Sequence, residues 1–79
     1  MEMPNLIPPY SLTLTPTGVH IEGHRGVEEY SGETITVRTK TKLITVTGRR
    51  LTLGAMTKSE MVITGVVQDI RIEDRGRRG

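Results

Sequence analysis

The chain has 79 residues and a mass of 8.8 kDa, which leaves room for one domain with a small core. Only 34% of its residues are hydrophobic and Phe and Trp are absent, so the core must be built from aliphatic side chains. The lack of Cys excludes disulfides, thiolate zinc sites and cysteine nucleophiles, and no apolar run reaches the ~20 residues that a membrane span requires. Because so thin a core leaves folding close to balance, we expect contact with another chain to supplement it.

The two ends of the chain differ from its middle in composition. Residues 1–11 are expected to form a Pro-rich arm, because proline lacks a backbone donor and favours extended conformations. Residues 74–79 are expected to form a basic, flexible tail that keeps the protein soluble. The β domain is expected over residues 12–73. The arginines of the tail are Arg75, Arg77 and Arg78.

The first two predicted strands, over 12–15 and 19–22, alternate apolar with polar residues, as expected of strands with one buried face. A Pro-Thr-Gly break separates them. Gly23 and Gly26 then bracket His-Arg, so we expect a tight turn there that relies on glycine conformations. A short strand over 27–30 follows.

The second half of the chain repeats the alternation, in strands predicted over 34–38, 43–47, 51–53, 61–64 and 66–72. In the first of these, Ile35 and Val37 are expected on the buried face. Residues 48–50, which read Gly-Arg-Arg, are expected to turn the chain between two strands. The alternation changes parity at Gly65, which predicts a bulge or a bend.

These short strands, with Thr at their outward positions and Gly between them, predict an all-β fold in a single small domain. The recurrence of one apolar pair per strand favours a repetitive sheet stack similar to a β-solenoid. A small barrel or sandwich is the alternative.

Residues 21–30 read Ile-Glu-Gly-His-Arg-Gly-Val-Glu-Glu-Tyr. This segment resembles the YabP/YqfC family of sporulation proteins from endospore-forming bacteria, whose members carry a similar I-E-x-H-R-G-apolar-x-E-Y segment. The likeness continues through 35–37, 48–53 and 63–67, and covers roughly 12–72. The resemblance implies a role in building the spore, in the mother cell or its coat, with no catalytic residues to carry over.

The densest polar cluster of the sequence consists of His24, Arg25, Glu29 and Tyr30. Catalysis would need a nucleophile or paired groups in a pocket that so small a β domain rarely encloses, so we expect no enzyme. In a structural interpretation, Arg25 pairs with Glu28 or Glu29, Tyr30 covers the edge of the core and His24 bonds to the turn. In the other interpretation the cluster is a protein-binding surface, because Arg and Tyr are frequent interface anchors.

Metal and nucleic-acid sites find little support. His20 and His24 lie four residues apart, but the glycine between them disfavours a shared face and no further ligand cluster is evident, so we expect no metal and no cofactor. Four basic residues precede or follow the predicted strand over 43–47, and they would form a basic stripe if the hairpins that carry them lay side by side. They are Lys40, Lys42, Arg49 and Arg50. Base-stacking aromatics are missing, so we do not expect nucleic acid as a partner.

The sequence therefore predicts a non-enzymatic structural protein of endospore formation that self-associates through sheet edges or ends, as a homo-oligomer or a filament. The alternative is a monomeric adaptor that holds a membrane-bound sporulation partner. A third hypothesis, nucleic-acid binding through the arginine tail, predicts a steeply salt-dependent affinity. The lack of Cys favours a reducing location, and we expect the cytoplasm of the mother cell or the spore coat.

Overall fold

The computed structural model describes residues 10–75, and all regular structure in this range is β-strand. The strands are β1 (Ser11–Thr15), β2 (Gly18–Glu22), β3 (His24–Tyr30), β4 (Thr34–Thr39), β5 (Lys42–Met56) and β6 (Glu60–Asp74). The predicted arm up to residue 9 and the predicted tail beyond residue 75 lie outside the described residues. Over the described range there is no helix of the length and hydropathy that crossing a membrane demands.

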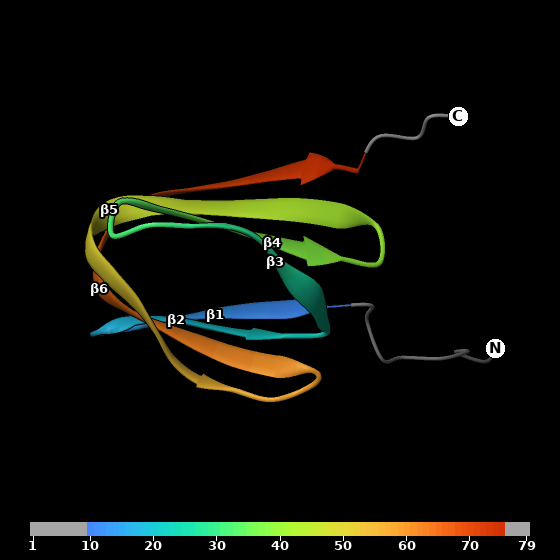
Figure 1. Ribbon diagram of the computed structural model, residues 1–79, viewed down its shortest axis with the longest axis horizontal. Helices are drawn as coiled ribbons and strands as arrows, with labels where there is room; N and C mark the ends of the chain where they lie inside the picture. The colour runs from blue at the N-terminus through green and yellow to red at the C-terminus, as the bar shows by residue number, and fades with distance from the viewer. Residues whose placement is uncertain (1–9, 76–79) are drawn as a thin grey trace, which may run out of the picture.

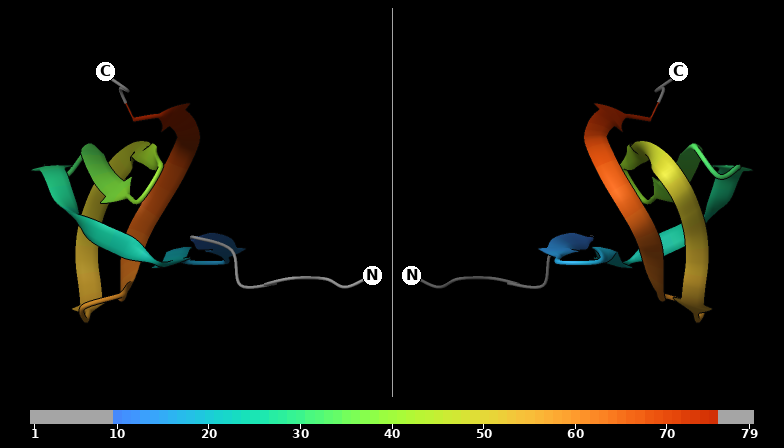
Figure 2. Two further views of the ribbon diagram at one scale, coloured as in Figure 1. Left: turned by 90° about the vertical axis from the view of Figure 1, so that its right-hand side faces the viewer. Right: turned by 90° about the vertical axis from the view of Figure 1, so that its left-hand side faces the viewer.

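The six strands form one sheet in the order β1-β2-β6-β5-β4-β3, and every neighbouring pair is antiparallel. The sheet folds over on itself, so that β1 and β2 lie in one layer with the start of β6 and the end of β5 (Figures 1 and 2). The other layer holds β3, β4, the start of β5 and the end of β6. The all-β single domain is confirmed. The antiparallel pairing gives a bent two-layer sheet, as in the sandwich alternative, and not the parallel coils of a solenoid.

The two long strands bend where they pass from one layer to the other. The β5–β6 register shifts around Gly48 and again beyond Arg49, and Arg50 takes a φ of 56°. The turn predicted over 48–50 is therefore wrong, because the chain bends there without reversing and β5 continues to Met56. The irregularity predicted at Gly65 is present, since its φ of 131° is a conformation that L side chains rarely adopt. The parity of β6 changes three residues later, at Gln68, which has no partner in the β5–β6 ladder.

The tight turn predicted between Gly23 and Gly26 is also wrong. Only Gly23 lies between strands, and its φ of 89° redirects the chain from β2 into β3, which begins at His24. Gly26 lies inside β3 at a register shift against β4. The segment is therefore a corner followed by a bulged edge strand, which a pair of glycines three residues apart does not distinguish from a hairpin turn.

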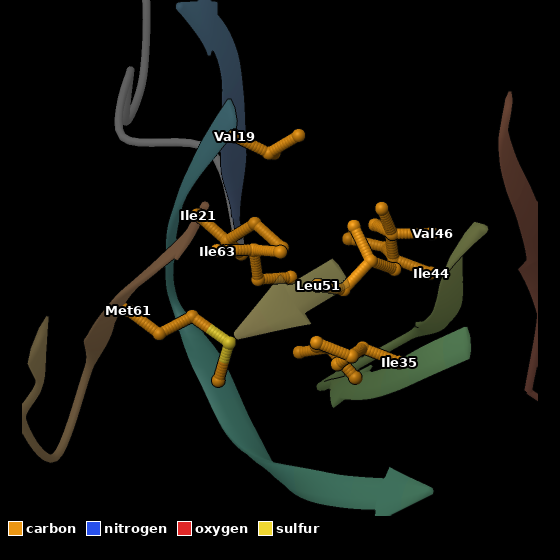
Figure 3. Close-up of a cluster of buried hydrophobic side chains, with 9 residues drawn as sticks. Val19, Ile21, Ile35, Ile44, Val46, Leu51, Met61 and Ile63 are labelled. Carbon is orange, nitrogen blue, oxygen red and sulfur yellow. The ribbon is translucent and has the colours of Figure 1, made fainter. Parts of the chain in front are cut away.

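The core lies between the two layers and is wholly aliphatic apart from one methionine. Figure 3 shows side chains of β2 and β6 pointing toward those of β4 and β5. The buried residues are Val19, Ile21, Ile35, Val37, Ile44, Val46, Leu51, Met61 and Ile63. The burial predicted for Ile35 and Val37 is thus confirmed. Each such side chain contributes roughly 1.5–3 kcal/mol by leaving water.

Several large apolar side chains stay outside this core. They are Leu14, Tyr30, Met56, Val66 and Ile72. Three of them, Leu14, Val66 and Ile72, come from β1 and from the second half of β6, so apolar surface is concentrated where the two layers open. A core that small beside exposed apolar surface is consistent with a protein that gains stability from association.

Candidate functional site

The four residues of the predicted site all lie on β3, a strand at one end of the sheet order. Cross-strand pairing sets their directions. Tyr30 lies opposite Ile35 and His24 opposite Thr39, both of which are buried, whereas Glu29 lies opposite Thr36 on the outer face. The structure therefore places His24 and Tyr30 on the core side and Glu29 on the other, and it does not gather all the predicted residues around one pocket.

His24 links the start of β3 to the loop between β5 and β6. Its side chain is 4% exposed, and Nε2 lies 2.9 Å from the backbone carbonyl oxygen of Thr57. The amides of Gly23 and His24 both donate to the carbonyl of Ser59 in the same loop, at 2.6 and 3.3 Å. Nδ1 has no hydrogen-bond partner among the described residues. The expected bond of His24 to its own turn is therefore wrong, because its partner is a carbonyl of the β5–β6 loop, 33 residues away. This bond fixes the corner of the fold.

Arg25 is exposed, and its predicted ion pair with Glu28 or Glu29 is wrong. Glu28 instead pairs with Arg38 of β4, whose Nη1 lies 2.5 Å from the carboxylate. The Nη2 atom of Arg38 donates to the backbone carbonyl of Arg25 at 2.8 Å. Arg38 therefore uses its guanidinium to hold the bulged part of β3, and the side chain of Arg25 remains without an ion-pair partner in residues 10–75.

Tyr30 and Glu29 make only weak polar contacts. The Tyr30 hydroxyl accepts a hydrogen bond from the Leu53 amide at 3.5 Å, and Glu29 accepts one from the Thr36 hydroxyl at the same distance. Tyr30 is 54% exposed. It leans on β5 at the rim of the core without closing it, so both Arg25 and Tyr30 remain accessible to a partner on this edge.

The sequence analysis missed a polar cluster that the structure assembles on the outer face of β2 and β6. His20, Glu22 and Glu60 bring their ligand atoms within 4.8 Å of one another, and His20 Nε2 lies 3.6 Å from a Glu60 oxygen. Ser11 donates to Glu22 at 3.2 Å. His24 is buried elsewhere, so the two histidines do not meet. Only the β2–β6 register, which puts Glu22 opposite Glu60, could have revealed this cluster.

The predicted basic stripe is partly neutralised. Lys42 forms a hydrogen-bonded ion pair with Asp74 across the β5–β6 ladder. This hydrogen bond and the charge of its partner raise the pKa of Lys42 and lower the pKa of Asp74. Arg75, which falls in the predicted tail, donates from Nη1 to the carbonyls of Thr39 and Lys40 at 3.0 and 3.3 Å.

A groove of about 640 Å³ lies where the two layers open, away from β3. One wall is the tip of the β1–β2 hairpin, with Leu14 and Pro16, and the other is residues 65–70 of β6. None of the four residues of the predicted site lines it. The sequence alternation marked Ile70 as a buried position but gave no signal that this end of the sheet stays uncovered.

Comparison with protein families gives one match. The chain belongs to the YabP family, whose pattern it matches over residues 11–79. Membership implies a sporulation-related protein, as the resemblance of residues 21–30 suggested. Comparisons with curated proteins and with solved structures find no significant match.

Proposed function

We propose that this member of the YabP family is a non-enzymatic structural protein of endospore formation that pairs its exposed sheet edges with copies of itself. It would act in the mother cell or in the spore coat. The observation that carries the proposal is the number of open edges in so small a sheet.

Open edges occur at four places in the described residues. The sheet order ends at β1 and β3, so each of these strands has one neighbour. Each long strand also has an open edge along one half. Residues 52–56 of β5 have only β6 as a neighbour, and residues 66–74 of β6 have only β5. Unpaired backbone donors and acceptors along such edges are templates for another strand.

The small core supports the same proposal. Within residues 10–75, nine hydrophobic side chains are buried, while five large ones remain exposed. A domain of 79 residues has roughly 4–12 kcal/mol of stability at ~0.05–0.15 kcal/mol per residue, so even a modest contribution from association changes the folded fraction. Stability and assembly are then coupled, and the protein is most stable when assembled.

The test is the mass of the purified protein as a function of concentration, by light scattering on a sizing column. We expect a mass above that of the 8.8 kDa monomer at high concentration, which falls reversibly on dilution. The midpoint of urea unfolding should rise with protein concentration, because dissociation and unfolding are linked. A monomer with a concentration-independent midpoint would refute the proposal.

A second candidate is the monomeric adaptor, favoured by the exposure of Arg25 and Tyr30 on one edge strand. Both residue types are common anchors in protein interfaces. The double variant Arg25→Ala/Tyr30→Ala separates the candidates. Loss of partner capture with unchanged folding and unchanged mass supports the adaptor, whereas unchanged capture removes it.

A further inference from the structure

The second half of β6 is a sheet edge of a particular kind. Residues 60–64 of β6 lie between β2 and β5, but from residue 66 to Asp74 only β5 is alongside. The amide of Gly65 donates to the carbonyl of Thr17 at 3.0 Å, and this is the last bond between β6 and the β1–β2 hairpin in the described residues. Figure 2 shows the end of β6 as the outermost strand of its layer.

This edge is less protected than the edge at β3. β3 has two register shifts against β4. The backbone carbonyl of Arg25 on β3 already accepts a hydrogen bond from the Arg38 guanidinium. Bulges and charged side chains of this kind discourage further strand pairing. In β6, by contrast, the register shifts once, at Gln68, and it then runs unbroken against β5 from Asp69 to Asp74. A regular stretch of backbone of this kind is what an added strand requires.

The core-facing side of the same edge is apolar and uncovered. Ile70 and Ile72 lie opposite Val46 and Ile44, which are fully buried, so all four side chains point to the core side of the sheet. Ile72 is nevertheless 44% exposed, and Ile70 lines the groove beside Leu14, which is 63% exposed. The interior surface of the sheet thus continues past the point where the other layer covers it.

The sequence of this edge is complementary to itself in the antiparallel direction. It reads Asp69-Ile70-Arg71, and a two-fold axis through Ile70 places Asp69 of each copy opposite Arg71 of the other. Both side chains are exposed, and neither has an ion-pair partner in the described part of the chain. Opposite charges directly across a strand pair stabilise it, and like charges destabilise it.

Resting on the self-association proposed above, we infer that the chain forms a two-fold dimer in which the β6 edges of two copies pair antiparallel about Ile70. The pairing joins the two sheets into one, makes two Asp69–Arg71 ion pairs and packs Ile70 against its own copy. Because the contact uses the same patch on both chains, it closes and leaves no further β6 edge.

The other symmetric registers are less complementary. An axis through Arg71 would place Arg71 opposite itself and Asp69 opposite Glu73, which are like charges. An axis through Ile72 would pair Arg71 with Glu73 and Asp69 with Arg75, but the Arg75 guanidinium already donates to two carbonyls of its own chain. It would also place Ile70 opposite Asp74, whose carboxylate is held by Lys42. The register about Ile70 has opposite charges on both sides of its centre and places no isoleucine opposite a carboxylate.

A charge-swap experiment tests both the edge and the register. The dissociation constant of the dimer is measured by sedimentation equilibrium for the wild type, Asp69→Arg, Arg71→Asp and the double variant. Each single variant should weaken the dimer at least tenfold, because both ion pairs become like-charge pairs. The double variant should return to within about threefold of the wild type, because each pair is restored with its polarity reversed. Under the register about Ile72, the double variant stays weak because Asp at 71 would face Glu73.

Cysteine cross-linking provides an independent readout, since the native chain contains no Cys. The two-fold axis puts Ile70 opposite itself, within disulfide reach, so Ile70→Cys should form a covalent dimer with oxidised glutathione as oxidant. Ile72→Cys is the matched control. Its copies would be four residues out of register, ~13 Å apart, and should not cross-link. Circular dichroism confirms that each variant keeps the fold.

The outcomes separate this inference from the proposed function. A wild-type chain that stays monomeric refutes both. A chain that self-associates while the charge swap fails to restore affinity, or while Ile72→Cys cross-links and Ile70→Cys does not, refutes the β6 register alone and leaves self-association through another edge standing.

Discussion

The close approach of β5 and β6 at the bend predicts a large effect of a single methyl group. A Cβ built on Gly48 would lie 1.9 Å from the Val66 carbonyl oxygen, about 1.1 Å closer than the 3.0 Å that real Cβ atoms keep. The obstacle is backbone, so no side-chain rotation can relieve it. Separating the strands by that much would break about two ladder hydrogen bonds, each worth about 1–1.5 kcal/mol net. Gly48→Ala should therefore cost about 2–3 kcal/mol.

Urea unfolding followed by circular dichroism measures this cost. On a domain with roughly 4–12 kcal/mol of stability, the loss should lower the melting temperature by about 8–24 °C, at about 4–8 °C per kcal/mol. Gly32→Ala is the matched control, since a Cβ there would meet nothing within 4 Å. It should change stability by no more than about 0.5 kcal/mol. A Gly48→Ala protein within about 1 kcal/mol of the wild type would refute the close approach of the two strands.

Three further predictions concern the core, the corner and the ion pair between Lys42 and Asp74. Truncating the fully buried Ile35 to Ala should cost about 2–5 kcal/mol in urea unfolding. His24→Ala should cost about 2 kcal/mol, because it removes the bond to Thr57 and leaves a cavity at the corner. Lys42→Met should remove a stabilising contribution that is constant near neutral pH and lost at both extremes, as seen by comparing unfolding curves across pH.

The pH prediction follows from the direction of the two pKa shifts. The pKa of Asp74 lies below its ordinary 3.8 in the folded protein, so its contribution is present above that value and lost as the pH falls through the folded pKa. The pKa of Lys42 lies above its ordinary 10.5, so its contribution is present below that value and lost as the pH rises further. Wild-type and Lys42→Met stabilities that converged near pH 7 would contradict the ion pair. High salt should reduce the difference, because the pair is exposed.

The controls for the other two variants are conservative replacements. Ile35→Val should cost less than half as much as Ile35→Ala, since it removes one methylene group. Equal costs would show that the side chain does not pack in the core. For His24, an unchanged stability of the Ala variant would show that the bond to Thr57 contributes nothing to the fold.

Local strand positions were readable from the sequence because period-two alternation reports directly on a strand with one buried face. The predicted strand over 34–38 and its buried Ile35 and Val37 match β4 closely. Gly65 correctly marked a bend, because its positive φ is open to glycine and rarely to other residues. The parity change itself arises three residues later, at the bulge at Gln68. These signals depend on a few neighbouring residues and need no knowledge of the partner strand.

The arrangement of the strands was not readable, for the same reason. Glycine at 48 is compatible with a hairpin turn or with a bend inside one strand, and only the pairing with β6 decides between them. The expected ion pair between Arg25 and a neighbouring glutamate is wrong because the β3–β4 register brings Arg38 to Glu28 instead. Arg38 lies thirteen residues from Arg25 in the sequence, so no local pattern indicates this contact. The exposure of Ile72 likewise depends on where the second layer ends, which no local pattern records.

Hydrogen exchange at two protein concentrations tests most directly whether the open sheet edges are sites of self-association. Amides are compared in dilute and concentrated protein, with the buried β4 amides as internal reference. Exchange at high concentration should slow most over residues 66–74 of β6, by more than it slows in β4, where it reports on the global stability. Exchange that is independent of concentration along every edge of the sheet would contradict the proposed self-association.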